Sequence, residues 1–344
     1  MATSSTITGG ISSVGTTAST LAGAVLKNTS LVATTKDTTA LLIADDVLPV
    51  NKTISLVSDS NKALVLNTNT AATVLGGTGN NNVLVANDAA GTVLQAGTGT
   101  GQTLVGGAGG QLLGTVNDPN SKATATIFGG TGNDTVVAAG GNNVLTAGEG
   151  NNVILSAAGN NQIWAAGNDT VYAAGGNATI GAGTGNAQIL ITQGNNLIAG
   201  GQGNTTIAAA AGNNTIFGGS GNALIAGGAG NDLLVGSTSK TGNAVIGGFA
   251  GNDTVIGGVG NDTLFGGEGN DIFVFSTVFG GGKHVIGDFK AGTDLIAVQG
   301  YGLTAAQVAS KVTVSGGSSV LSLSDGTQIT IAGVTNLTAS NFAV

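Results

Sequence analysis

A dipeptide repeated at nine-residue intervals constrains this chain more than any other feature of its sequence. Between residues 132 and 270, sixteen Gly-Asn pairs occur, almost all of them nine residues apart. The exceptions are one eight-residue step into Gly167 and one twelve-residue step into Gly242. A short fixed period means that each repeat is one small structural unit stacked on its neighbours. We therefore expect a solenoid, which grows by adding turns and needs no second globular core.

The pattern within one repeat predicts how a turn is built. Each repeat reads x-x-x-Gly-Asn-x-x-U-x, and U is apolar and mostly β-branched in all sixteen copies, from Val136 to Phe273. Residues of this kind favour a short strand, and Gly-Asn favours a tight corner. Two repeats then make one turn with a strand on each side, with U pointing inward and positions seven and nine outward. The predicted fold class is all-β, a parallel β-roll of nine-residue repeats with two repeats per turn.

The regularity of the repeat divides the chain into four predicted parts. They are a flexible or irregular N-terminal arm (1–40), degenerate solenoid turns (41–128), the regular β-roll (129–274) and a C-terminal cap (275–344). Within the cap, residues 304–311 are expected to form one helix capped by Thr304. Residues 312–314, 320–323 and 328–331 are expected to form antiparallel strands, with a turn at Asp325-Gly326. Such a cap would cover the open end of the β-roll.

Composition excludes several classes of function. The net charge is −8, all nine basic residues are Lys, and no basic face is available for nucleic acid. The absence of Cys excludes disulfides and cysteine nucleophiles. No apolar run is long enough for a membrane-spanning helix, and the N-terminus does not have the pattern of a secretory signal. His284 is the only His, so no His-Glu-x-x-His zinc motif exists, and we expect no enzymatic activity.

Six repeats place Asp directly after Gly-Asn, and four of them crowd the end of the β-roll. The segments GGAGNDLLV, FAGNDTVI, GGVGNDTLF and GGEGNDIFV resemble the calcium-binding RTX nonapeptide G-G-x-G-x-D-x-U-x. The tail, from HVIGDFKAGTDLIAV to the C-terminus, is similar to the C-terminal region of RTX proteins exported by type I secretion. The resemblance implies calcium as the cofactor, the type I secretion machinery as a partner, and an extracellular or bacterial cell-surface location.

The resemblance also implies which residues bind metal. Asp232, Asp253 and Asp271 fall in alternate repeats, so they are expected on one edge, where they would hold two calcium ions between them. Asp262 falls on the other edge, where the preceding turn has Ala244. That edge is expected to bind more weakly, or to use Asp288 and Asp294 of the GDFKAGTD segment.

The middle repeats depart from the family pattern. Their sixth position is mostly Asn, Ala or Thr, which cannot balance a divalent ion. Asp134 and Asp169 are candidate ligands too, but no carboxylate is expected on the loop facing either of them. We therefore expect a calcium-poor middle held by stacked Asn side chains and backbone ladders. The alternative for all these Asp residues is that they are solvated turn formers.

The outward positions are unusually apolar for a soluble β-roll. Position nine includes Trp164, Tyr172 and Phe217, and a contiguous apolar strip indicates an interaction surface. We therefore expect a secreted calcium-binding structural protein that self-assembles into an extracellular layer, filament or biofilm matrix. The alternative is a calcium-dependent adhesin, with a cell-surface glycan as a candidate partner, or an ice-binding module. The N-terminal arm could also cover part of the strip.

Overall fold

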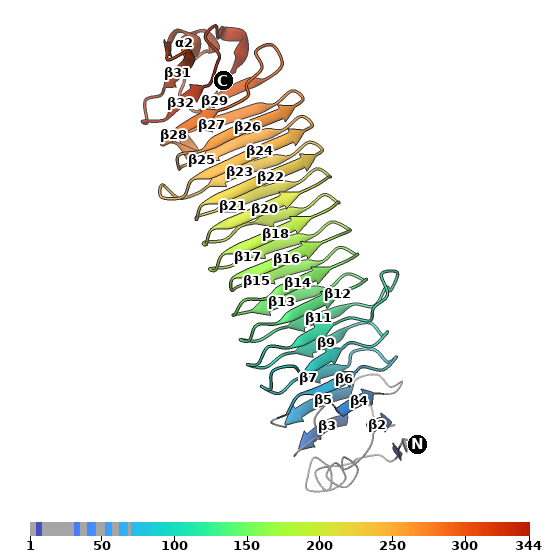
Figure 1. The fold of residues 1–344 in the computed structure, drawn as a ribbon. Helices are drawn as coiled ribbons and strands as arrows, with labels where there is room; N and C mark the ends of the chain where they lie inside the picture. Colours follow the sequence, from blue (N-terminus) through green and yellow to red (C-terminus); the bar gives the residue numbers. More distant parts are fainter. Residues whose placement is uncertain (1–4, 9–30, 35–39, 46–51, 57–61, 68–69) are drawn as a thin grey trace. The chain divides into compact units, whose positions relative to one another are not determined.

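The structure, a computed structural model, describes residues 5–8, 31–34, 40–45, 52–56, 62–67 and 70–344. The chain divides into two compact units, Met1–Gly175 and Gly176–Val344. Both are built from short parallel strands that alternate between two sheets along the chain (Figure 1). The predicted fold class, an all-β parallel solenoid, is confirmed. The predicted N-terminal arm (1–40) falls largely outside the described residues, apart from two short strands that pair in parallel.

Among the described residues of the first unit, nine strands form one sheet and seven form the other. The first sheet contains, in spatial order, β1 (Ser5–Thr8), β2 (Leu31–Thr34), β4 (Lys52–Leu56), β6 (Ala72–Leu75), β8 (Val93–Gln95), β10 (Leu112–Gly114), β12 (Thr135–Ala138), β14 (Val153–Ser156) and β16 (Asp169–Ala173). The second contains β3 (Ala40–Asp45), β5 (Lys62–Asn67), β7 (Val83–Val85), β9 (Gln102–Val105), β11 (Ala125–Phe128), β13 (Val144–Gly148) and β15 (Gln162–Ala165).

The second unit continues the same pattern and then ends in a different one. One sheet contains β18 (Ala187–Ile191), β20 (Thr205–Ala209), β22 (Ala223–Ala229), β24 (Ala244–Ala250), β26 (Thr263–Glu268) and β28 (Lys283–Ile286). The other contains β17 (Thr179–Ala182), β19 (Leu197–Ala199), β21 (Thr215–Gly219), β23 (Leu233–Ser237), β25 (Thr254–Gly258), β27 (Ile272–Ser276), β29 (Leu295–Gln299) and β33 (Phe342–Ala343). Short 3-10 helices, η1 (Thr277–Phe279) and η2 (Ala339–Asn341), lie in the C-terminal segment.

The C-terminal segment has the predicted elements. Helix α2 (Ala305–Ser310) begins at Thr304, whose side chain accepts a hydrogen bond from the Gln307 N–H in a capping box. Strands β30 (Val312–Ser315), β31 (Ser318–Ser322) and β32 (Gln328–Ile331) pair antiparallel, and β32 joins β28 in parallel. The helix and strand predictions are confirmed, whereas the division of the whole chain into four parts stays a prediction.

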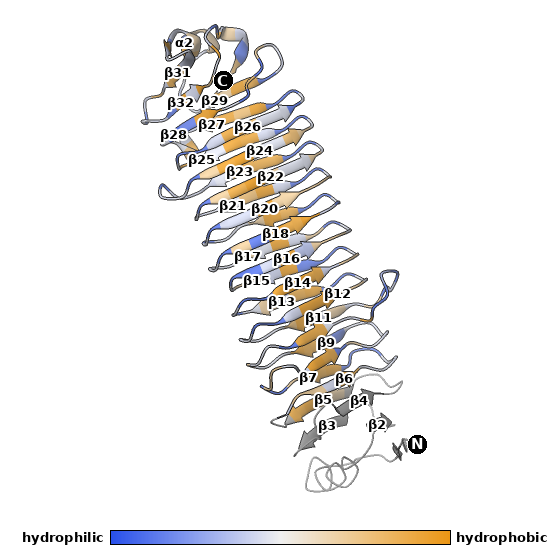
Figure 2. Cartoon of the chain, in the orientation of Figure 1, coloured by the Kyte–Doolittle hydropathy of each residue, from blue (hydrophilic) through white to orange (hydrophobic). Residues whose placement is uncertain are grey.

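The register shows why the nine-residue period specifies this core. Val136 pairs with Ile154, and Leu145 pairs with Ile163, so strands two repeats apart lie side by side. All sixteen U residues are at most 1% exposed, as predicted. In most strands alternation turns positions seven and nine toward solvent, for example in the buried–exposed pattern of β15, whereas Val235 at position nine of its repeat is only 3% exposed. In Figure 2 apolar residues follow the strands and polar residues gather in the connecting loops.

Candidate metal centre

The side chains at position six form a buried hydrogen-bonded ladder along one edge of the second unit. The Oδ1 atom of each side chain accepts the backbone N–H of position six one turn earlier. The steps are Ala178 to Asn196 (2.8 Å), Asn196 to Asn214 (3.1 Å), Asn214 to Asp232 (2.6 Å), Asp232 to Asp253 (2.8 Å), Asp253 to Asp271 (2.9 Å) and Asp271 to Asp294 (3.2 Å). Buried backbone amides need such partners, so Asn and Asp serve the ladder equally well through Oδ1.

The Asn at position five forms a second ladder that runs in the opposite direction and is exposed. The Asn213 Oδ1 accepts the backbone N–H of Asn231, and the Asn231 Oδ1 accepts that of Asn252. The Asn Oδ1 and the Asp Oδ1 of the Gly-Asn-Asp triplet are therefore both used in backbone pairing between turns. The predicted stacking of Asn side chains is confirmed.

Asn and Asp differ in what their second side-chain atom does. In turns with Asn at position six (Asn turns) the amide NH₂ donates to backbone carbonyls. Asn196 Nδ2 donates to Gly194 O (2.7 Å) and Asn214 Nδ2 to Gly212 O (2.9 Å) in their own loops, and Asn214 Nδ2 also donates to Gly227 O (3.3 Å) of the next turn. The first unit repeats this at Asn143, whose Nδ2 donates to Gly140 O (2.9 Å). An Asn turn therefore supplies hydrogen-bond donors to nearby backbone carbonyls without any ligand.

In Asp turns the corresponding atom is an oxygen, and it is left without a donor. The Oδ2 atoms of Asp232, Asp253 and Asp271 are buried and have no hydrogen-bond partner among the described residues. A Cβ added to Gly248 would clash with both Asp253 Oδ2 and Gly266 O, so these two oxygens border the same small space. Gly227 stands in the same relation to Asp232 Oδ2 and Gly248 O. Two oxygens facing one another in a buried space favour a cation between them.

The electrostatic state of these carboxyl groups reflects their burial. Burial raises the pKa of Asp232 from 3.8 to about 7 and that of Asp253 to about 6, and it also raises the pKa of Asp271. In all three groups a hydrogen bond from a backbone N–H partly offsets this rise in pKa. The charge of the next carboxylate along the edge raises the pKa further. The charged forms are thus unfavourable until a cation compensates them.

In the first unit, the two candidate ligands differ from each other. Asp134 Oδ2 is buried without a partner, and a Cβ on Gly129 would clash with Ala147 O and lie 2.8 Å from Asp134 Oδ2. Burial raises the pKa of Asp134 to about 6. Asp169 instead accepts the Gly167 N–H at Oδ2 (3.0 Å) and the Asn152 NH₂ at Oδ1 (2.8 Å). Only Asp134 therefore reproduces the arrangement of Asp253, and the side chain on the turn that follows it is Asn152, as predicted, not a carboxylate.

The opposite edge of the second unit ends in a histidine. Asp262 Oδ1 accepts the Ala244 N–H (2.6 Å), and its Oδ2 lies 3.1 Å from His284 Nδ1. The distance is that of an ion pair, although neither atom has an aligned hydrogen-bond partner within the described part of the chain. His284 Nε2 lies 3.0 Å from Gly281 O, and its ring packs against Phe275. His284 is therefore buried among structural contacts.

The expectation that Asp288 and Asp294 could serve the Asp262 edge is wrong. The GDFKAGTD segment connects β28 to β29, so it crosses at the same edge as the loops that precede β23, β25 and β27. Asp294 consequently continues the Asp271 ladder, and its Oδ2 accepts the Lys290 N–H (2.8 Å). Asp288 accepts the N–H groups of Gly266 and Gly267 (both 2.9 Å).

Lys290 lies at the candidate metal edge and was not identified by the sequence pattern. Its Nζ donates to Gly267 O (2.5 Å), a carbonyl of the loop that leads to Asp271. An ammonium group therefore lies where the turns before it have only carboxylate and carbonyl oxygens. The one signal in the sequence is the Lys within GDFKAGTD, between two Asp residues that would otherwise repel Asp271.

The donor set fits a hard cation bound largely by the backbone. No three His, Cys, Asp or Glu side chains come together as a metal cluster in the described ranges. Calcium, however, accepts backbone carbonyls together with one or two carboxylates. Asp232, Asp253 and Asp271 on one edge, and Asp134 in the first unit, would supply the carboxylates.

Comparison with known families decides the identity of the repeats. A family model described as the RTX calcium-binding nonapeptide repeat (4 copies) matches residues 128–163, 165–189, 191–225, 222–238 and 247–276. This part of the chain is an RTX-type repeat region. Its nonapeptide repeats are of the calcium-binding kind, and the matched segments cover every Asp that follows Gly-Asn.

Solved structures were also matched, and two of them show the following similarity to this chain. One is the AlgE6R3 subunit of the Azotobacter vinelandii mannuronan C5-epimerase, with 27% identity, a TM-score of 0.27, and coverage of 36% of this chain and 80% of that one. The other is the extracellular lipase LipA from Serratia marcescens, with 18% identity, a TM-score of 0.23, and coverage of 57% and 40%. No curated protein matches the sequence. Within the described residues, no helix is long and apolar enough to cross a membrane.

Proposed function

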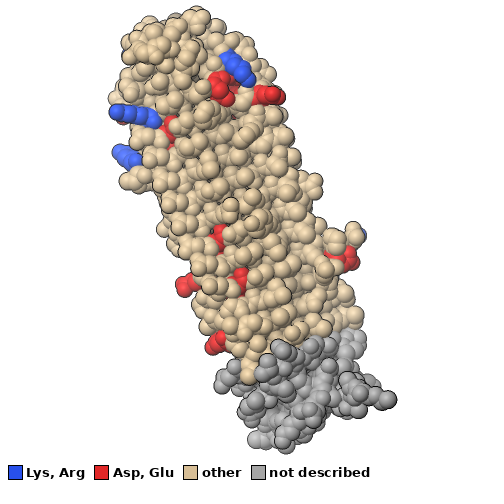
Figure 3. Space-filling view, viewed as in Figure 1, with Lys and Arg blue, Asp and Glu red and all other residues tan. Residues whose placement is uncertain are grey.

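We propose that this RTX-type protein is a secreted structural protein that self-assembles with calcium into an extracellular layer, filament or matrix. The observation that carries the proposal is the combination of cation-requiring loops with outer faces that are apolar and nearly free of charge. In the view of Figure 3, charged side chains are few and lie singly or in small groups, with uncharged surface between them. Exposed apolar residues occur on the outer sheet faces of each unit.

Large aromatic side chains are exposed on these faces. Trp164 is 47% exposed, Tyr172 44% and Phe217 37%, each at position nine of its strand. Large apolar patches on a soluble protein indicate contact surfaces, and aromatic residues are enriched at such contacts. These three residues are proposed to lie at or near contacts between copies.

Calcium would couple folding to location in this proposal. Loops with buried, unpartnered carboxylates are unstable at low calcium and become stable once a cation binds, so binding energy becomes folding energy. The resemblance of the segment 280–344 to type I secretion signals supports export through the C-terminus. RTX repeat proteins are typically secreted. Deletion of residues 280–344 should trap the protein inside cells, whereas deletion of residues 2–30 should leave export intact; the reverse result would refute this route.

Sizing by sedimentation velocity, with electron microscopy of the same samples, tests self-assembly. Wild-type protein should form oligomers or filaments at millimolar calcium and dissociate in chelator. The double variant Trp164→Lys, Phe217→Lys should shift toward monomer in calcium. A wild type that stays monomeric at high concentration in calcium would refute the structural role and favour a binding module.

A further inference from the structure

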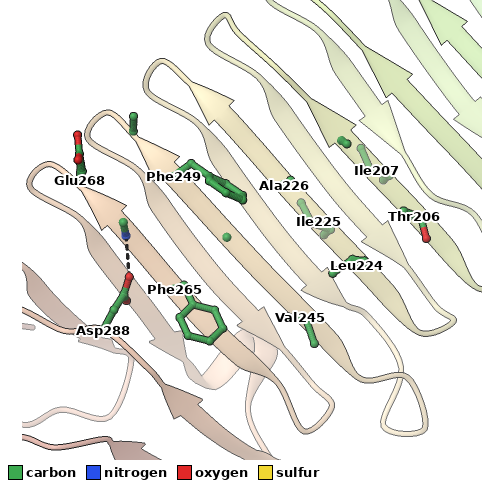
Figure 4. Close-up of a pocket in the computed structure, with 14 residues that line it drawn as sticks. Thr206, Ile207, Leu224, Ile225, Ala226, Val245, Phe249, Phe265, Glu268 and Asp288 are labelled. Atoms are coloured by element: carbon green, nitrogen blue, oxygen red, sulfur yellow. Dashed lines mark hydrogen bonds between the residues drawn. The ribbon is translucent and has the colours of Figure 1, made fainter.

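The outer face of the β20–β26 sheet carries an apolar groove of about 820 Å³ within the second unit. Its floor is made of small residues at position nine of consecutive strands, Ala208, Ala226 and Gly247. Leu224 (51% exposed) and Val245 (44%) form one wall at position seven. Figure 4 shows Phe249 and Phe265 toward the end of the groove that is closest to Asp288. This face therefore combines a hollow lined by small residues with apolar side chains that protrude beside it.

Phe249 holds its place in the groove at a cost in backbone strain. Its φ is 78°, in the left-handed region. In the described part of the chain, Phe249 and Asn81 are the only non-glycine residues with positive φ. Its partners on the neighbouring strands are Gly228 (φ 95°) and Gly267 (φ 100°), so the turns on both sides use glycine here. A bulky side chain in this region is sterically disfavoured, and such strain is often found at functional positions.

The exposure of Phe249 makes the strain harder to explain by folding alone. The side chain is 59% exposed, so its burial in the monomer offsets little of the strain. A Cβ on Gly247 would lie 3.0 Å from the Phe249 ring, which shows that the ring rests against the groove floor. The residue thus shapes the groove and presents an aromatic edge to solvent.

The charges around the groove are confined to one end. Glu268 and Asp288 line it there, and the Lys290 ammonium bonds to Gly267 O at the same end, so carboxylates outnumber ammonium groups. The opposite end has the uncharged Thr206. Because each copy carries a net charge of −8, two copies can approach most favourably through a face whose centre is uncharged.

We propose that this groove is the contact surface for a second copy of the chain, bound antiparallel about a two-fold axis between Ala226 and Gly247. The inference rests on the self-assembly proposed above and assigns a surface to it. A two-fold contact requires one patch that is complementary to itself, and here the aromatic groups of one copy face the small-residue floor of the other. The antiparallel arrangement places the acidic end of one copy opposite Thr206 of its partner. A parallel arrangement would place acid opposite acid.

Two substitutions and a matched control test the surface. Phe249→Gly restores the glycine found on the neighbouring turns, so it should raise the melting temperature of the monomer in calcium while weakening self-association at least tenfold. Val245→Lys should weaken association to a similar extent. Val314→Lys, at a 58% exposed strand valine in the C-terminal segment, should leave association unchanged.

Cross-linking tests the two-fold axis directly, because the chain has no cysteine of its own. With a short bis-maleimide, Ala226→Cys should cross-link to itself, whereas Glu268→Cys alone should not, since its copies lie about 14 Å or more apart at ~4.8 Å per strand. A mixture of Thr206→Cys and Glu268→Cys should give a mixed cross-link.

The outcomes separate the groove from the wider proposal. If wild type associates and Phe249→Gly and Val245→Lys associate equally well, the groove is not the contact surface and self-assembly stands. Self-cross-linking of Glu268→Cys would overturn the antiparallel arrangement. A strictly monomeric wild type would overturn both the groove and the self-assembly.

Discussion

Replacing Asp253 by Asn is expected to stabilise the calcium-free protein and to weaken its response to calcium. The substitution keeps Oδ1, which accepts the Asp232 N–H. It replaces Oδ2, which has no hydrogen-bond partner in the described structure, by an NH₂ group that can donate to loop carbonyls as Asn214 does. The change thus converts a turn that needs a cation into one that does not.

The size of the effect follows from the buried charge. Burial raises the pKa of Asp253 from 3.8 to about 6, and at 1.36 kcal/mol per pKa unit the ionised group costs about 3 kcal/mol above pH 7. The Asn variant should therefore be about 3 kcal/mol more stable in chelator. A calcium site with an affinity of about 10⁻⁴–10⁻³ M contributes about 1.4–2.7 kcal/mol at 10 mM calcium. Asp253 borders one or two sites, so the stabilisation by calcium should shrink by about 1–5 kcal/mol.

Urea denaturation at pH 8, in chelator and in 10 mM calcium, measures both quantities. Asp253→Ala is the control, because it removes the negative charge but also leaves the Asp232 N–H without its acceptor, which costs about 1–3 kcal/mol. The Asn variant should therefore exceed the Ala variant in stability in both conditions. If Asp253→Asn is less stable than wild type in chelator and keeps the full calcium response, the reasoning is wrong.

Three further predictions follow from the same contacts. In chelator, denaturant titrations should show the stability falling as pH rises from 5 to 8. The folded-state pKa is raised to about 7 for Asp232 and to about 6 for Asp253, so the contribution of these two groups to stability is present below pH 3.8 and is lost as pH passes through 6 to 7. A rise in stability over that range would contradict this. Asn214→Asp should lower the calcium-free stability by about 1–3 kcal/mol and add calcium binding in calorimetry; unchanged stoichiometry would count against it. Lys290→Gln should destabilise the C-terminal turns in chelator, with Lys290→Arg restoring them, as read by hydrogen exchange of residues 266–299; equal exchange in both variants would exclude a role for the ammonium charge.

The architecture could be predicted from the sequence because one residue type recurs at one position. The period of nine and the unbroken series of apolar U residues specify which side chains are buried, and the register of Val136 with Ile154 follows from two repeats per turn. The short helix after Thr304 was also predictable, because its capping signal is local.

The candidate site was predictable only in part, because its details depend on contacts between segments. The strand that precedes the GDFKAGTD segment decides which edge this segment joins. Because that strand, β28, was not predicted, the pairing of Asp294 with Asp271 could not be foreseen from the sequence. Likewise, Asp134 and Asp169 have the same local motif, yet only Asp169 receives a second backbone donor, from Gly167. The eight-residue step into Gly167 is the sequence signal that accompanies this difference.

Hydrogen exchange of the wild-type protein with and without calcium tests the central claim most directly, that Asp turns need a cation and Asn turns do not. Calcium should strongly protect the amides of β23, β25 and β27, which follow Asp232, Asp253 and Asp271, while those of β19 and β21, which follow Asn196 and Asn214, should exchange slowly in both conditions. Uniform protection of all five strands by calcium, or none in any of them, would contradict the account.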